Sequence, residues 1–203
     1  MSFFDYFQLA SLGLVLAVFI TKAVYLRATA NVTAIVVGRS GSIASRLMDI
    51  VALTGLLWWL FEIAAYATHW SAAAVPAALH QQLLDSSFAR VVGVILISMG
   101  LLLFLLAYLN FGPSWRVGID RVSPGALVTK GIFSLTRNPI YVFIDAWFIG
   151  TFLLNGTLFF LISAMLAIAS QHWQILREER FLSERYGAQY EEYQRRTARY
   201  LIW

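Results

Sequence analysis

The amino-acid sequence predicts an all-α integral membrane protein with about five transmembrane helices, and three observations support this fold class. Of the 203 residues, 60% are hydrophobic and only 13% are charged, whereas a soluble domain usually carries about 25% charged residues. The mean hydropathy is +0.70. Apolar runs of about 20 residues recur, each long enough to cross about 30 Å of hydrocarbon. This composition excludes a water-soluble enzyme, and the absence of cysteine excludes disulfide and thiol chemistry.

Five apolar segments account for the predicted helices. Their approximate bounds are 7–26, 47–67, 91–111, 139–154 and 157–176. The fourth segment begins at Pro139, a residue suited to the first turn of a helix, and Asn155-Gly156 is a turn signal between the fourth and fifth segments. We expect a single membrane domain over 1–203, in which 1–111 hold three helices and 112–203 form a catalytic-type region.

The distribution of Lys and Arg predicts how these helices cross the membrane. Segments 27–46, 112–138 and 177–203 are rich in arginine, whereas the connections that alternate with them hold only Arg90. Basic residues concentrate in cytoplasmic loops. The sequence therefore predicts an N-terminus outside and a C-terminus in the cytoplasm, in a multi-pass protein of the bacterial inner membrane.

The predicted hairpin between the last two segments places the candidate site. The helices go out and back, so Tyr141 and Glu178 should return to the same membrane face as spatial neighbours. A site built from 129–141 and 174–187 would lie at the cytoplasmic boundary. There it could take a polar ligand from water and an apolar ligand from the bilayer.

Each of these two stretches also has a simpler interpretation. Arg137 and Asn138 precede a helix N-terminus, where an anion such as a carboxylate is favoured, although a helix cap and a cytoplasmic arginine would explain them as well. Aromatic residues at helical spacing in 182–193 are typical of an interfacial amphipathic helix, which Gly187 should interrupt. A membrane anchor explains the Glu178-Glu179 pair poorly, because anionic lipids do not attract acids.

Taken together, the two stretches form a longer pattern. The pattern reads Gly131-x-Phe133, then Arg137-Asn138-Pro139-x-Tyr141, then the hairpin, then Glu178-Glu179-x-x-Leu182-x-x-x-Tyr186-Gly187-x-x-Tyr190-x-x-Tyr193. It resembles the isoprenylcysteine carboxyl methyltransferase family and related phospholipid-type integral membrane methyltransferases. Those enzymes show Gly-x-Tyr, Arg-His-Pro-x-Tyr and Glu-Glu-x-x-Leu-x-x-x-Phe-Gly-x-x-Tyr-x-x-Tyr. The resemblance covers about 127–199, and the first three segments share only their apolar character.

The resemblance implies S-adenosylmethionine as methyl donor, S-adenosylhomocysteine as product and a lipid-soluble or lipidated acceptor. The cofactor-binding residues that it implies are Leu127, Val128, Phe133, Asn138, Pro139, Ile140, Tyr141 and Glu178. Glu178 would accept a hydrogen bond from the cofactor's α-ammonium, and Asn138 with the helix N-terminus would hold its carboxylate. Phe133 and Tyr141 would face the adenine or the sulfonium cation.

Two positions depart from the family pattern and leave the acceptor open. Asn138 replaces the family's histidine and cannot carry charge. Gln174 stands where the family often has an arginine that meets the acceptor's carboxylate, and Arg177 follows three residues later. Because a neutral amide pairs poorly with a carboxylate, the methylated group could be an amine, hydroxyl or thiol as well as the carboxyl of a prenylated cysteine.

Four residues are catalytic candidates, namely Asp145, His172, Gln174 and Arg177. Asp145 lies one turn after Tyr141 on the same helix face and should line the acceptor site, and His172 could act as a base. Asp49 and Glu62 are also acids within apolar segments, where such residues are functional candidates. The simpler explanations are interhelical hydrogen bonds for the three acids and a place at the membrane interface for His172.

Other partners and functions can be weighed from the same residues. We expect no metal site, because His69, His80 and Asp85 are too scattered for ligand spacing, and no nucleic-acid partner. One alternative function is an NADPH-dependent reductase of sterol-like substrates, with phosphates bound by basic residues of 112–138. Another is a non-catalytic lipid-binding membrane protein. Binding of S-adenosylhomocysteine, of NADPH or of neither would separate the three.

Overall fold

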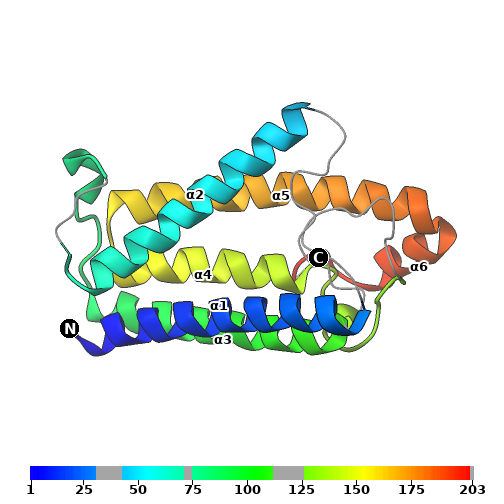
Figure 1. Ribbon diagram of the computed structural model, residues 1–203, viewed down its shortest axis with the longest axis horizontal. Helices are drawn as coiled ribbons and strands as arrows, with labels where there is room; N and C mark the ends of the chain where they lie inside the picture. The colour runs from blue at the N-terminus through cyan, green and yellow to red at the C-terminus, as the bar shows by residue number, and fades with distance from the viewer. Residues whose placement is uncertain (31–42, 71–74, 112–125, 202–203) are drawn as a thin grey trace. The chain divides into compact units, whose positions relative to one another are not determined.

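The computed structural model describes residues 1–30, 43–70, 75–111 and 126–201, and the regular structure in these ranges is helical (Figure 1). The helices are α1 (Phe3–Ala30), α2 (Ile43–Ala67), η1 (Ala77–His80), α3 (Ser87–Phe111), η3 (Gly131–Ser134), α4 (Pro139–Asn155), α5 (Leu158–Tyr186) and α6 (Ala188–Arg196). Each predicted segment coincides with one helix. The all-α fold class is therefore confirmed.

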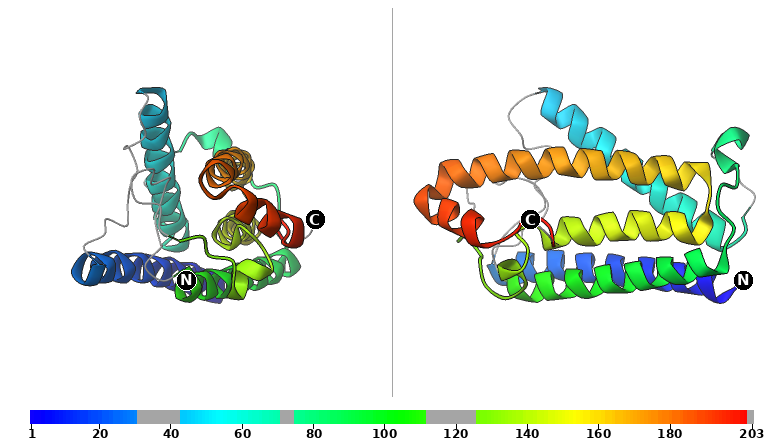
Figure 2. Two further views of the ribbon diagram at one scale, coloured as in Figure 1. Left: turned by 90° about the vertical axis from the view of Figure 1, so that its right-hand side faces the viewer. Right: turned by 180° about the vertical axis from the view of Figure 1, so that it is seen from behind.

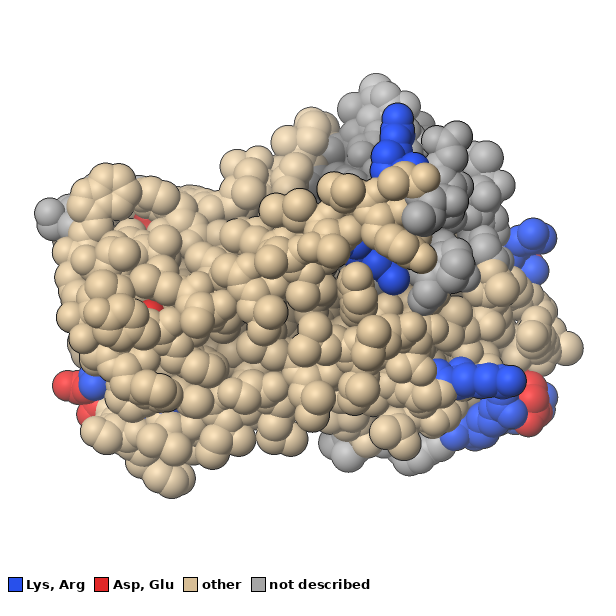
Figure 3. Space-filling view, turned by 60° about the horizontal axis from the view of Figure 1, so that its bottom comes forward, with Lys and Arg blue, Asp and Glu red and all other residues tan. Residues whose placement is uncertain are grey.

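Within the described ranges, four helices are long and apolar enough to cross a membrane, namely α1, α2, α3 and α5. Helix α4 is apolar but has only 17 residues, a length of about 25 Å. The face drawn in Figure 3 is mostly uncharged, as a lipid-facing surface is expected to be. These lengths and compositions indicate a multi-pass membrane protein.

Helix α5 extends well beyond its expected end near Leu176. Its continuation through Tyr186 is rich in Arg and Glu, which favour helix. The helix ends only at Gly187, where φ is +49°. The predicted interruption at Gly187 is confirmed, because α6 begins at Ala188. The predicted amphipathic segment is thus continuous with the last apolar helix, and only its second piece is separate.

The chain forms two compact units. The first unit holds α1 and α2, which pack together; Asp5 Oδ2 lies 3.0 Å from His69 Nε2. The buried Glu62 accepts a hydrogen bond of 3.1 Å from Trp58 Nε1 on the same helix. The side chain of Asp49 lies outside the described residues. The second unit holds η1, α3, η3, α4, α5 and α6 and contains the candidate site.

Within the second unit, α4 lies between α3 and α5 (Figure 2). The backbones of α3 and α4 approach closely because small residues face each other: a Cβ added at Gly93 would lie 2.7 Å from the carbonyl oxygen of Gly150. Further along the same contact, the rings of Phe104 and Phe143 stack with centroids 4.7 Å apart. Small residues at such contacts are typical of helix packing in membranes.

The turn between α4 and α5 is held by the segment that precedes α3. Gly156 has φ +68°, and a Cβ there would collide with the carbonyl oxygen of Leu84. Gln82 Nε2 donates to the carbonyls of Leu84 (2.7 Å) and Asn155 (3.0 Å). Glycine is therefore required at the predicted Asn155-Gly156 turn for two reasons, its left-handed backbone and its close contact. The closed turn fixes α4 and α5 as one hairpin.

Candidate functional site

The open end of the α4–α5 hairpin brings together residues that are distant in the sequence. The Tyr141 hydroxyl, in the first turn of α4, donates a hydrogen bond of 2.7 Å to Glu178 Oε1 on α5. These two residues are thus neighbours, as the out-and-back path of the hairpin predicts. Gln174 Nε2, one turn before Glu178, donates to the same oxygen at 3.1 Å.

The Glu178 carboxylate is held from one side. Both hydrogen bonds to it from described residues end on Oε1, and none from the described part of the chain ends on Oε2. Arg177 does not contact Glu178 by a hydrogen bond; its Nη1 donates to Gln174 Oε1 at 3.4 Å, and its guanidinium lies 4.5 Å from the centre of the Trp173 ring. Gln174 and Arg177 therefore belong to one chain of contacts that ends on Glu178.

The other two catalytic candidates have separate partners. Asp145, one turn further along α4 than Tyr141, accepts a hydrogen bond of 3.0 Å from Gln171 Nε2 on α5. His172 is exposed, and its Nδ1 lies 2.7 Å from the hydroxyl of Tyr200. Burial and the nearby Asp145 carboxylate raise the pKa of Tyr200 above its ordinary value.

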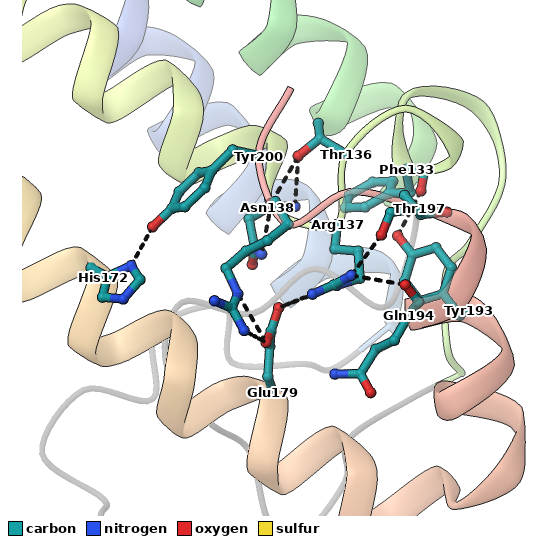
Figure 4. Close-up of polar contacts among 11 residues, drawn as sticks. Phe133, Thr136, Arg137, Asn138, His172, Glu179, Tyr193, Gln194, Thr197 and Tyr200 are labelled. Atoms are coloured by element: carbon teal, nitrogen blue, oxygen red, sulfur yellow. Dashed lines mark hydrogen bonds and ion pairs between the residues drawn. The ribbon is translucent and has the colours of Figure 1, made fainter. Parts of the chain in front are cut away.

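An ion network centred on Glu179 lies beside these contacts. The Glu179 side chain is only 7% exposed, and its two oxygens pair with Arg137 Nη2 and Arg199 Nη2, each at 2.8 Å (Figure 4). Arg137 also donates to the carbonyl oxygens of Thr197 (2.6 Å) and Gln194 (3.2 Å). The anion that Arg137 meets is thus a side chain of the protein itself, and the Glu179 carboxylate raises the pKa of Arg199.

This network holds the segment after α6 against the start of α4. The backbone N–H of Arg137 donates to Ala198 O at 2.9 Å, in a parallel bridge between Thr136 and Ala198. Thr136 Oγ1 and Asn138 Nδ2 both donate to Arg199 O at 3.1 Å. We call residues 197–201 the C-terminal strap. No motif in the sequence signals it, because which carbonyl oxygens the side chains of Thr136, Arg137 and Asn138 reach depends on the path of the chain after α6.

The remaining residues that the resemblance implies for the cofactor are apolar. We call this set the floor: Leu127, Val128, Phe133, Pro139 and Ile140. Val128 and Ile140 pack against a buried cluster that contains Phe133 and Ala107, and the Phe133 ring meets the Phe111 ring edge-on at 5.0 Å. Leu127 is half-buried just before η3, and Pro139 is buried at the first position of α4.

Two contacts fix this floor in place. Gly131, at the start of η3, has φ +63°, and a Cβ there would collide with Asn110. The hydroxyl of Tyr193 donates to Phe133 O at 2.6 Å. The floor is therefore anchored to α3 on one side and to α6 on the other.

Comparison with known proteins identifies the family. The model of the phospholipid methyltransferase family matches residues 88–189, half of the chain, from the first turn of α3 to the start of α6. The chain belongs to the phospholipid methyltransferase family. The match includes Tyr141, Asp145 and Glu178 and ends before the C-terminal strap. No curated protein and no solved structure matches the chain. Membership of the phospholipid methyltransferase family indicates methyl transfer in a membrane.

Proposed function

We propose that the protein transfers a methyl group from S-adenosylmethionine to a lipid-soluble acceptor at the cytoplasmic boundary of the membrane. The observation that carries this proposal is the Glu178 carboxylate at the open end of the hairpin, held on one oxygen by Tyr141 and Gln174, in a chain of the phospholipid methyltransferase family. The proposal includes five membrane crossings, with α4 as the shortest, and an N-terminus outside.

The residues present fit this cofactor. An α-ammonium group needs a carboxylate with a usable oxygen, and no described residue donates to Glu178 Oε2. An adenine ring needs apolar contact, which the floor beside Val128 and Ile140 offers. Asn138 lies at the N-terminal end of α4, where free N–H groups favour a carboxylate. When bound, the cofactor supplies an activated methyl group on a sulfonium.

The chain's own residues then have two tasks, orientation and exclusion of water. Methyl transfer requires the nucleophile to lie in line with the methyl group, in surroundings that do not solvate it. Tyr141 and Gln174 hold the Glu178 carboxylate in one position, because each donates to the same oxygen. The strap is hydrogen-bonded to Thr136 and Asn138 just before α4, and we propose that it helps to exclude water from this end of the hairpin.

Ligand binding tests this proposal. Detergent-solubilised protein should bind S-adenosylhomocysteine and not NADPH, as measured by isothermal titration calorimetry. Glu178→Gln keeps an oxygen for Tyr141 but removes a charge-assisted bond worth about 1.5–3 kcal/mol, so the affinity should fall about 10- to 100-fold.

Glu184→Gln is the matched control, because Glu184 is an exposed carboxylate on the same helix. Glu179 cannot serve as the control, since it is buried against two arginines. Binding of NADPH alone, or equal losses of affinity from Glu178→Gln and Glu184→Gln, would contradict the proposal.

A further inference from the structure

Asp145 and Gln171 are the innermost polar pair between α4 and α5. Asp145 lies four residues from Tyr141, about 6 Å further along α4, and Gln171 lies seven residues from Glu178, about 10 Å along α5. One further turn along each helix, the neighbouring positions are Phe148 and Ile168. The polar stripe that begins at Glu178 therefore ends at this pair, and apolar surface follows.

The pair is incomplete as a hydrogen-bonding unit. Gln171 Nε2 donates to Asp145 Oδ1 at 3.0 Å, but the amide oxygen Gln171 Oε1 is buried and has no hydrogen-bond partner in the described structure. A buried polar atom without a partner costs about 1–3 kcal/mol, and an acid in an apolar helix is a functional candidate. If Gln171 served only to bond α5 to Asp145 on α4, its amide nitrogen would have a role, but the burial of its amide oxygen without a partner would have no reason.

The chemistry of the unused atoms defines what can complete the pair. The amide oxygen and the carboxylate oxygens accept hydrogen bonds, and Gln171 Nε2 gives one of its two hydrogens to Asp145 Oδ1. The buried oxygen without a partner, Gln171 Oε1, can be paired only by a hydrogen-bond donor. A group that binds here must therefore bring its own hydrogens. An amine or a hydroxyl does so, whereas a carboxylate would place like charges together and leave Gln171 Oε1 unpaired.

We propose, on the basis of the proposed function, that Asp145 and Gln171 hold the nucleophilic group of the acceptor through its N–H or O–H hydrogens and exclude a carboxylate. The acceptor is then a lipid-soluble amine or alcohol, whose hydrocarbon chain lies against the apolar surface beyond the pair. Gln171 Oε1 orients the group, and Asp145 is the base that receives its proton.

The transfer balances with these two residues. The lone pair of the acceptor's nitrogen or oxygen forms the new bond to the methyl carbon, and the carbon–sulfur bond breaks with both electrons remaining on sulfur. The hydrogen that leaves the nitrogen or oxygen passes as a proton to the Asp145 carboxylate. The products are the methylated amine or ether, a neutral thioether and protonated Asp145, and the net charge is unchanged.

The test uses three probes of one chain length that differ only in the head group: dodecylamine, dodecanol and dodecanoate. Binding of each probe to the full-length protein with S-adenosylhomocysteine present is measured by microscale thermophoresis. The wild type should bind the amine or the alcohol at least about ten-fold more tightly than dodecanoate. Asp145→Asn and Gln171→Met should each reduce this preference to within about two-fold.

Two controls separate a direct role from a structural one. In Asp145→Asn, the asparagine side chain still accepts from Gln171 Nε2, so the interhelical bond and the melting temperature should be retained. Ser170→Ala changes the neighbouring exposed residue, whose hydroxyl donates only within α5, and it should keep the wild-type preference. Methyl transfer to the preferred probe should fall about 100-fold or more in Asp145→Asn, while affinity for S-adenosylhomocysteine stays within about two-fold.

The outcomes distinguish this inference from the proposed function. Dodecanoate binding as tightly as the other two probes, or a preference that survives both variants, would overturn the inference alone, provided that S-adenosylhomocysteine binds. A wild-type protein that does not bind S-adenosylhomocysteine would overturn the proposed function and this inference with it.

Discussion

At the residue scale, Glu178 and Glu179 show how two adjacent identical side chains acquire different roles. Successive residues on a helix point about 100° apart, so Glu178 faces Tyr141 on α4 while Glu179 faces Arg137 and Arg199. No described residue donates a hydrogen bond to Oε2 of Glu178, the oxygen that we propose meets the cofactor. The Glu179 carboxylate is fully engaged with the protein's own arginines, and its role is structural.

We expect Glu179→Gln to lower the free energy of unfolding by about 3 kcal/mol, because breaking a buried ion pair leaves an uncompensated charge, here the buried Arg137 guanidinium. Thermal unfolding in detergent, followed by circular dichroism, measures the effect. Glu192→Gln is the control, since Glu192 is exposed and pairs with Arg195 at 3.7 Å, and its loss should cost under about 0.5 kcal/mol. Similar melting temperatures for the two variants would show that the network contributes little.

The proximity of Tyr141 and Glu178 was predictable from the sequence, because a short turn between two helices returns their ends to one place. The partner of Arg137 was not predictable. The sequence suggests an anion near a helix N-terminus, and the hairpin brings 129–141 close to 174–187, but nothing in the sequence shows that Glu179 rather than Glu178 pairs with Arg137, or that Arg137 also donates to the carbonyl of Thr197. Such contacts depend on the path of the chain over many residues and leave no local pattern.

At the scale of the helices, hydropathy predicted α1 to α5, because the bilayer demands about 20 apolar residues per crossing, whereas the short helices η1 and η3 were not predicted. Hydropathy does not predict that α5 continues without a break from its apolar part into the charged part up to Tyr186, because a change from apolar to charged residues marks a change of surroundings and not the end of a helix. The close packing of α3 on α4 was also beyond prediction. Gly93 and Gly150 face each other, while a Cβ added at Gly55 would meet no other described side chain or packed helix within 4 Å. Nothing in the sequence distinguishes these glycines.

Alanine substitutions at Gly150 and at Gly55 should therefore change the stability of the protein in opposite directions. A Cβ at Gly150 would lie 2.5 Å from Ile97 Cγ1 and 2.9 Å from Gly93 O, so Gly150→Ala should destabilise the protein by about 1–3 kcal/mol through overpacking. Gly55→Ala should be neutral or stabilising by up to about 1 kcal/mol, because alanine is the better helix former. Melting temperatures of the two variants measure this, and a stabilised Gly150→Ala would mean that the helices are less closely packed than described.

At the scale of the whole molecule, composition sufficed for the fold class, and the asymmetry of arginine predicts the orientation. A C-terminal reporter fusion should be active in the cytoplasm, and an N-terminal epitope should be accessible from outside intact cells, because basic loops stay on the cytoplasmic side. Fusions with the opposite behaviour would place Glu178 and the strap on the outer face. That result would separate the site from the compartment that makes its cofactor. The acceptor's head group could not be predicted from composition, and the selection that we propose for it involves a single buried amide oxygen, Gln171 Oε1.

The strap also sets an order of events during synthesis. Thr136 and Arg199, which it joins, are separated by 63 residues, and a ribosome adding about 5–20 residues per second needs about 3–12 s to cover that distance. Throughout that interval Arg137 has been made, but the carbonyl of Thr197 that it binds has not. The nascent chain therefore inserts its helices before the end of the hairpin can close. A ribosome that stalled after α5 would leave a chain in which Arg137 can pair with Glu179 but lacks the carbonyl oxygens of Gln194 and Thr197.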